Sequence, residues 1–147
     1  METIPKTNLG EVVQQLLSKV PPKSSRSGRA ALVTLSGDLG AGKTTFVQEL
    51  AKALGISEAV VSPTYVLMKK YVLTGQPFKQ LVHIDAYRLA GAHEFEALDP
   101  ASFLLDEDAL VCIEWPERIE GALPTPDVEL VLSAEGMGDH ERGIHFK

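Results

Sequence analysis

The segment Gly37–Thr44 limits the folds open to this chain more than any other segment does. It reads GDLGAGKT and follows the pattern G-x-x-x-x-G-K-[ST]. Its glycines let the backbone curl so that successive N–H groups point inward and form a concavity for an anion. An apolar, strand-like run at 30–35 precedes the motif and a helical pattern at 45–54 follows it, which is the context that a phosphate-binding loop requires.

This motif predicts a nucleotide site. Lys43 is placed to hold the β- and γ-phosphates, and the Thr44 hydroxyl to ligate Mg²⁺. A helix that begins here adds the positive end of its dipole. The residues expected to bind the nucleotide are Asp38, Leu39, Gly40, Ala41, Gly42, Lys43, Thr44 and Thr45.

The order of the remaining patterns predicts an α/β fold. Apolar residues at helical spacing run from Leu9 to Val20, and a helical stretch at 93–105 is broken near Pro100. Strands are expected at 30–35, 66–72, 78–84, 109–113, 127–132 and 143–146, the second and third of them as a hairpin. We expect a P-loop NTPase-like three-layer sandwich with a mostly parallel central sheet and antiparallel additions. Residues 1–147 should form one domain, with an exposed loop at 21–28.

Composition limits the function classes. The chain has 14 basic and 20 acidic residues, for a net charge of −6, whereas a free-standing nucleic-acid binder usually carries the opposite sign. If RNA is involved, we therefore expect a partner to hold it. The single cysteine, Cys112, excludes an intramolecular disulfide and a cysteine-based zinc site. With no signal-peptide pattern and no apolar stretch long enough for a bilayer, we expect a cytoplasmic protein.

Two acids are candidates for the chemistry that a phosphate loop needs. Glu114 directly follows the apolar run 109–113, and Asp85 directly follows 81–84. Ligands of open α/β sheets bind beyond the carboxyl ends of the strands, so both acids are expected to face the phosphates. Thr64, in the segment SPTY before the next strand, offers a hydroxyl where GTPase-like proteins place a switch threonine, although a turn motif explains it equally well.

Neighbouring residues are more ambiguous. Arg88 either contacts a phosphate or forms a surface ion pair. Trp115 is expected to pack or to contact a partner, with stacking on a base as the alternative. His83, inside an apolar strand, is expected to be a core or rim histidine rather than a metal ligand.

Four segments together closely resemble the TsaE family, which are bacterial P-loop ATPases. They are LSGDLGAGKTTF at 35–46, VVSPTYVLMKKY at 60–71, HIDAYRL at 83–89 and IEWPER at 113–118. The resemblance implies an ATP-hydrolysing component of tRNA threonylcarbamoyladenosine synthesis that works with the proteins TsaD and TsaB and meets tRNA through that complex. It implies that Lys43 holds the phosphates and that Thr44 and Glu114 ligate Mg²⁺. Thr64 then belongs to a switch-like loop, and Asp85 serves hydrolysis through Mg²⁺ or the attacking water.

Other readings of the same core stay open. A small-molecule kinase usually carries an arginine-bearing lid, and the sequence has no arginine cluster after Arg88. A signalling GTPase would need an N-K-x-D sequence, which the chain lacks. A nucleotide-dependent binding module whose turnover is incidental is the third alternative, because weak hydrolysis alone fits a partner-controlled switch.

Overall fold

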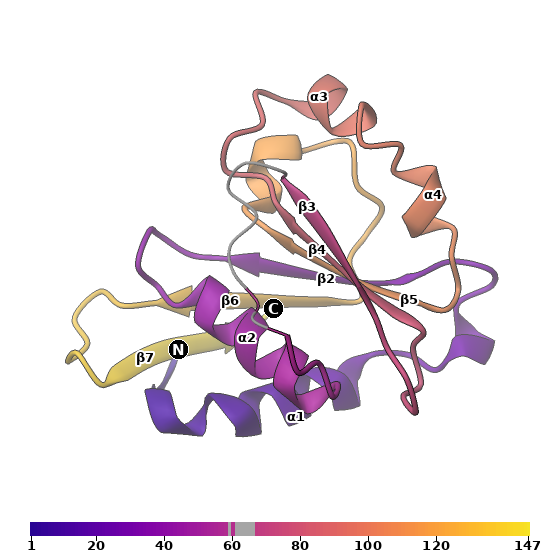
Figure 1. Ribbon diagram of the computed structural model, residues 1–147. Coiled ribbons are helices and arrows are strands. Elements are labelled where there is room, and N and C mark those ends of the chain that lie inside the picture. The colour runs from indigo at the N-terminus through magenta and orange to yellow at the C-terminus, as the bar shows by residue number, and fades with distance from the viewer. Residues whose placement is uncertain (59, 61–66) are drawn as a thin grey trace.

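The computed structural model describes residues 1–58, 60 and 67–147 of the chain, in a three-layer arrangement (Figure 1). The strands are β1 (Glu2–Pro5), β2 (Ala31–Ser36), β3 (Met68–Val72), β4 (Gln80–Asp85), β5 (Ala109–Glu114), β6 (Val128–Ser133) and β7 (Glu141–Phe146). The α-helices are α1 (Leu9–Lys19), α2 (Lys43–Ala53), α3 (Ala92–Glu96) and α4 (Ala101–Leu104). Short 3₁₀ helices are η1 (Lys6–Asn8), η2 (Lys23–Ser25) and η3 (Pro116–Ile119).

All these strands form one sheet in the order β1-β7-β6-β2-β5-β4-β3. The four strands at its centre, β6, β2, β5 and β4, are parallel. The pairings β1–β7, β6–β7 and β3–β4 are antiparallel. The α/β class and the antiparallel additions are confirmed, but "mostly parallel" describes the centre of the sheet rather than the whole.

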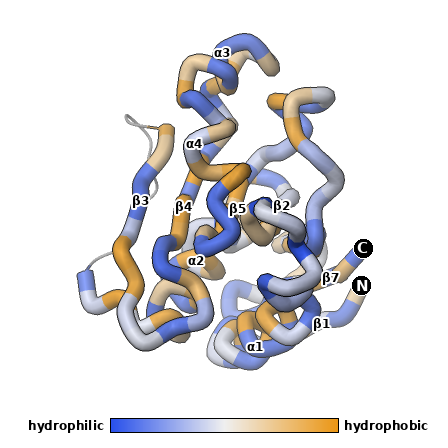
Figure 2. Tube along the Cα trace, turned by 90° about the vertical axis from the view of Figure 1, so that its right-hand side faces the viewer, coloured by the Kyte–Doolittle hydropathy of each residue, from blue (hydrophilic) through white to orange (hydrophobic). Residues whose placement is uncertain are grey.

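Side-chain alternation along the strands divides the core into two layers. Val33 and Leu35 of β2 face α1 and α2, where they pack with residues such as Leu16 and Phe46. Leu32, directly before Val33, faces the other side and packs with Phe103 of α4. Figure 2 shows hydrophobic residues following β4 and β5 through the middle of the fold. The helical stripe predicted from Leu9 onward therefore has its apolar face on the sheet, as its spacing requires.

One local expectation needs correction, and one strand was not predicted. The loop at 21–28 is not simply exposed, because the side chain of Arg26 is only 2% exposed. Its guanidinium donates to the carbonyl oxygens of Pro21 at 2.7 Å and Glu107 at 2.8 Å, and it lies over the ring of Phe78. Strand β1 was not predicted, because Ile4 is its one buried residue and a single apolar position gives no alternation.

The predicted hairpin is confirmed as the antiparallel pair β3–β4, although residue 66 of the expected strand lies outside the described residues. None of the helices in the described part of the chain combines the length and the apolar character needed to cross a bilayer.

Candidate functional site: the phosphate loop and the ends of three parallel strands

The phosphate loop connects β2 to α2, and two of its glycines are required by its shape. Gly37 has a φ of 144°, and a Cβ added there would lie 2.2 Å from the carbonyl oxygen of Leu132 in β6. Gly42 has a φ of 102°, a left-handed conformation that L side chains adopt only with strain. It stands at the N-cap of α2, and its carbonyl accepts the first helical hydrogen bond from the Phe46 N–H at 2.8 Å. The motif therefore forms the strand–loop–helix turn that the sequence predicts.

Lys43 turns back over this loop. Its Nζ donates to the carbonyl oxygens of Gly37 and, at 2.9 Å, of Asp38. It also lies 4.3 Å from the centre of the Trp115 ring. Burial lowers the pKa of Lys43, and nearby carboxylates, Glu114 first among them, oppose that shift. The ammonium group is thus held at the phosphate loop on a residue that is only 5% exposed, where a polyanion would meet it.

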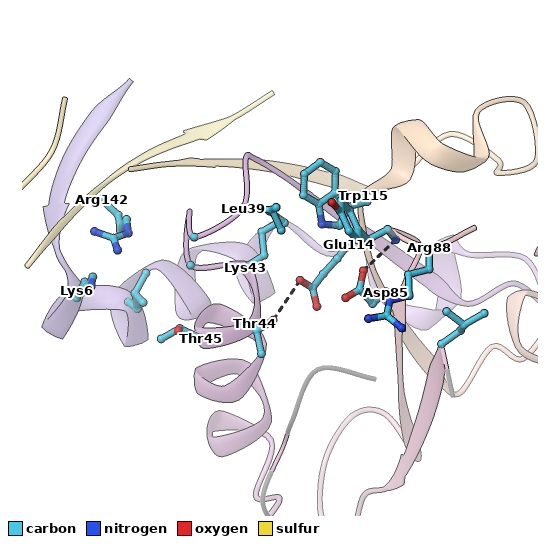
Figure 3. A pocket seen from close by; sticks show the side chains of 15 residues that line it. Lys6, Leu39, Lys43, Thr44, Thr45, Asp85, Arg88, Glu114, Trp115 and Arg142 are labelled. Carbon is cyan, nitrogen blue, oxygen red and sulfur yellow. Dashed lines mark hydrogen bonds between the residues drawn. The ribbon is translucent and has the colours of Figure 1, made fainter. Parts of the chain in front are cut away.

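Strand register explains why Glu114 and Asp85 lie together. They are direct partners in the β4–β5 pairing, at the carboxyl ends of both strands, and Leu35 of β2 pairs with Glu114 on the other side. Glu114 is 2% exposed, and its Oε1 accepts a hydrogen bond from the Thr44 hydroxyl at 3.4 Å. Figure 3 shows Glu114 and Asp85 side by side, with Thr44 of α2 opposite Glu114. Both acids therefore lie at the same pocket as the phosphate loop, and their expected roles toward phosphates and Mg²⁺ stay predictions.

Asp85 also shapes the turn that follows β4. Its Oδ1 accepts a hydrogen bond from the Tyr87 N–H at 3.0 Å. The Tyr87 ring in turn packs on Trp115, with centroids 4.9 Å apart, and the Arg118 guanidinium lies over Tyr87 at 4.9 Å. Trp115 has a φ of 59°, and its backbone N–H donates to the carbonyl oxygen of Leu35 at 3.1 Å. This left-handed turn after β5 brings the indole over Lys43, so Trp115 packs on Tyr87 and Lys43, while base stacking and partner contact stay predictions.

These groups line one pocket of about 570 Å³. The residues predicted for the site that line it are Leu39, Gly40, Gly42, Lys43, Thr44, Thr45, Asp85 and Glu114. Asp38 and Ala41 contribute to the loop without lining the pocket: the Asp38 carbonyl accepts from Lys43, and Ala41 is buried. Thr64 lies outside the described residues, so its place in the site stays a prediction.

The oxygen donors of this pocket suit Mg²⁺. That ion commonly takes one or two protein oxygens and completes its shell with substrate phosphates and water. Thr44 and Glu114 are such a pair, within hydrogen-bonding distance at the base of the loop. Within residues 1–58, 60 and 67–147, no group of three or more His, Cys, Asp or Glu residues is arranged to hold a metal ion.

Sequence reasoning missed several residues around the pocket. Lys6, at the start of η1, and Arg142, in β7, line it from the opposite side of the phosphate loop (Figure 3). The Arg142 side chain packs against Gly42, its Nε lying 3.8 Å from where a Cβ of that residue would be. Arg88, expected from the sequence to contact a phosphate or to form a surface ion pair, also lines the pocket, beside Asp85. Cations far apart in the sequence therefore converge here, although the sequence contains no arginine cluster.

His83 was expected to be a core or rim histidine, and it is fully buried in β4. Its Nε2 lies 2.5 Å from Oε2 of Glu114, a contact that the sequence interpretation did not anticipate. The contact follows from the β4–β5 register, in which His83 pairs with Cys112 and Glu114 is two residues further along the same face of β5. No pattern within either segment reveals that register.

The fold and the site together define an α/β protein of the P-loop NTPase-like class. A family model described as "Threonylcarbamoyl adenosine biosynthesis protein TsaE" matches residues 6–144. The chain belongs to the TsaE family. Curated relatives of that name are described as tRNA threonylcarbamoyladenosine biosynthesis proteins.

Individual relatives agree with the family model. The tRNA threonylcarbamoyladenosine biosynthesis protein TsaE of Haemophilus influenzae is 39% identical over 68% of this chain, and that of Bacillus subtilis is 37% identical over 78%. The aligned parts span 61% and 68% of the lengths of those two proteins. Among solved structures, the crystal structure of Bacillus subtilis YdiB matches with a TM-score of 0.66 and 27% identity, covering 99% of this chain and 82% of that one.

Proposed function

We propose that this chain is the ATP-binding and ATP-hydrolysing component of the bacterial machinery that makes threonylcarbamoyladenosine in tRNA. One observation carries the proposal: Lys43, Thr44, Asp85 and Glu114 surround a single pocket at the carboxyl ends of parallel strands. That is where open α/β sheets bind nucleotides, and these are the residue types that phosphoryl transfer uses.

In this proposal the loop backbone from Asp38 to Thr45 and the Lys43 ammonium hold the phosphates. The Lys43 hydrogen bonds to the Gly37 and Asp38 carbonyls are exchanged for contacts with phosphate oxygens, which are stronger because both partners are charged. Thr44 and Glu114 would hold Mg²⁺, which when bound neutralises phosphate charge and orients the chain of phosphates.

Asp85 is the group we assign to hydrolysis. It lies beside Glu114, and its carboxylate borders the pocket, so it can orient an attacking water or act through the metal. Thr64 would complete the site as part of a switch-like loop. We take ATP as the nucleotide on the family resemblance and on the missing N-K-x-D sequence.

The wider role is also a proposal. As in the family it resembles, the chain would act as a single P-loop ATPase domain in the cytoplasm, bound to TsaD and TsaB, and would support turnover of the threonylcarbamoyl-transfer complex. Its net charge of −6 supports contact with tRNA through those partners rather than directly.

The test is ATP hydrolysis by the chain alone and then with purified TsaB and TsaD. We expect a large rise on adding the partners. Equal rates would leave a P-loop ATPase with a different role, and no hydrolysis in either mixture, with ATP binding intact, would favour the nucleotide-dependent binding module.

A matched variant tests the site itself. Lys43→Met keeps an unbranched apolar side chain and removes the ammonium group that lies over the Trp115 ring. We expect ATP affinity to fall at least about tenfold, or about 1.4 kcal/mol, in equilibrium binding measurements. Wild-type affinity would refute the phosphate-loop assignment.

A further inference from the structure

The contact between His83 and Glu114 carries an inference that goes beyond the proposed ligands. His83 is fully buried and Glu114 is 2% exposed, so their 2.5 Å contact is shielded from water. Because a carboxylate only accepts hydrogen bonds, the imidazole donates from Nε2. A buried carboxylate without a donor would be costly, and the His83 donor lies on the neighbouring strand rather than in the pocket.

The two oxygens of Glu114 have different partners. Oε2 is bound by His83 on the sheet, whereas Oε1 is directed to the Thr44 hydroxyl. The imidazole contact therefore restricts rotation of the carboxylate and leaves Oε1 turned toward the start of α2. His83 itself is not among the described residues that line the pocket, so any effect on a ligand must pass through Glu114.

The other ring nitrogen of His83 adds no hydrogen bond to the core among the described residues. Nδ1 of His83 is buried and has no hydrogen-bond partner among the residues that the structure describes. In a position chosen for packing alone, an apolar side chain would avoid the cost of burying that nitrogen. The neighbours on the same face, Leu81 and Cys112, are of that apolar kind.

We propose that His83 is a positioning residue: it orients the Glu114 carboxylate so that, with Thr44, it presents an oxygen to Mg²⁺ in the nucleotide site. The inference rests on the proposed function, because it needs Glu114 to be a metal ligand. Partners that orient a metal-binding side chain typically change metal affinity 10–100-fold when they are removed.

The test compares near-isosteric substitutions. His83→Gln retains an N–H donor that can reach the position of Nε2, whereas His83→Met fills a similar volume without a donor. Cys112→Ala, at the paired position of β5, is the control for disturbed packing in the same layer. Glu114→Gln shows how far the Mg²⁺ dependence shifts when the proposed metal ligand itself is lost. Thermal melts establish that each variant is folded.

The readout is ADP affinity measured by calorimetry, first in EDTA and then across a series of Mg²⁺ concentrations. For His83→Met we expect the EDTA affinity to stay at the wild-type value and the Mg²⁺ concentration for half-maximal effect to rise about 10–100-fold. His83→Gln should bring the Mg²⁺ concentration for half-maximal effect most of the way back to the wild-type value. Cys112→Ala should leave that concentration unchanged.

Each other result overturns the inference in a recognisable way. If Glu114→Gln shifts the Mg²⁺ midpoint and His83→Met does not, His83 is a core residue and the proposed function stands. Equal shifts in His83→Met and Cys112→Ala would reduce the effect to packing. If Glu114→Gln leaves the Mg²⁺ dependence unchanged, the metal assignment fails together with the inference, and absence of ADP binding by the wild type would refute the nucleotide site itself.

Should His83→Met fail to fold, His83→Asn serves in its place. Its shorter amide is polar and cannot reach Glu114 as the glutamine amide does. The same Mg²⁺ shift is then expected for Asn and not for Gln, and identical behaviour of the two variants would contradict the proposal.

Discussion

The first glycine of the phosphate loop offers a quantitative test of how the loop is seated on the sheet. An ideal Cβ at Gly37 would lie 2.2 Å from the carbonyl oxygen of Leu132 and 3.1 Å from Cβ of Ala41. The first of these atoms is backbone in β6, which pairs with β2 on one side and β7 on the other. It cannot move aside as a flexible side chain could.

Gly40 provides the matched control within the same loop. It also has a positive φ, of 80°, but a Cβ there would meet nothing within 4 Å. Alanine at Gly40 should therefore cost only the conformational strain, about 1–2 kcal/mol. Alanine at Gly37 should add the overpacking cost, about 1–3 kcal/mol more.

At about 2–4 °C per kcal/mol for a chain of this size, Gly37→Ala should melt about 2–12 °C below Gly40→Ala. The assay is thermal unfolding without nucleotide, so that altered phosphate binding does not enter the comparison. Equal melting temperatures would show that the loop is not pressed against β6 and would refute the steric argument.

Three further changes test the site, the core and the electrostatics. Asp85→Ala should keep ATP binding and lose hydrolysis. Unchanged turnover would show that Asp85 has only a structural role, as the acceptor of the hydrogen bond from the Tyr87 N–H. Leu16→Ala removes a fully buried side chain of α1 and should lower the free energy of unfolding by about 2–5 kcal/mol in denaturant melts, with ADP affinity unchanged because Leu16 does not line the pocket. Burial tends to raise the pKa of Asp127, but hydrogen bonds from Arg29 and the Leu32 N–H outweigh it and hold the pKa below its usual value. A carboxyl group whose pKa is lower in the folded state stabilises the fold at pH values above its pKa in the unfolded state. This stabilisation is lost as the pH falls through the folded-state pKa, so the stability of the protein should decline below about pH 4. Asp127→Asn should show a smaller decline in melts recorded across pH, and an identical pH profile would remove Asp127 from the acid response.

The sequence predicted those parts of the site that depend on local order. The phosphate loop is contiguous, and Glu114 and Asp85 each follow an apolar strand directly, so one rule about strand ends placed both. The same local patterns predicted β2, β5 and the β3–β4 hairpin. In these cases the signal lies within about ten residues of the feature it predicts.

The missed features depend on which strands become neighbours. Lys6 and Arg142 reach the pocket because β1 pairs with β7, and Ile4 of β1 is aligned with Arg142 itself. The burial of Arg26 depends on carbonyl groups of two separate loops, those of Pro21 and Glu107. The contact of His83 with Glu114 needs the β4–β5 register. A periodicity within one segment contains none of this information.

The pairing of β1 with β7 also bears on when the pocket can be completed during synthesis. The Lys6 N–H donates to the carbonyl oxygen of His140 at 2.7 Å, so an early and a late part of the sequence are joined beside the nucleotide pocket. The phosphate loop at 37–44 leaves the ribosome long before Arg142 does. A nascent chain thus exposes its anion-binding loop while one wall of the pocket is still missing, and that wall forms only after β7 has been synthesised.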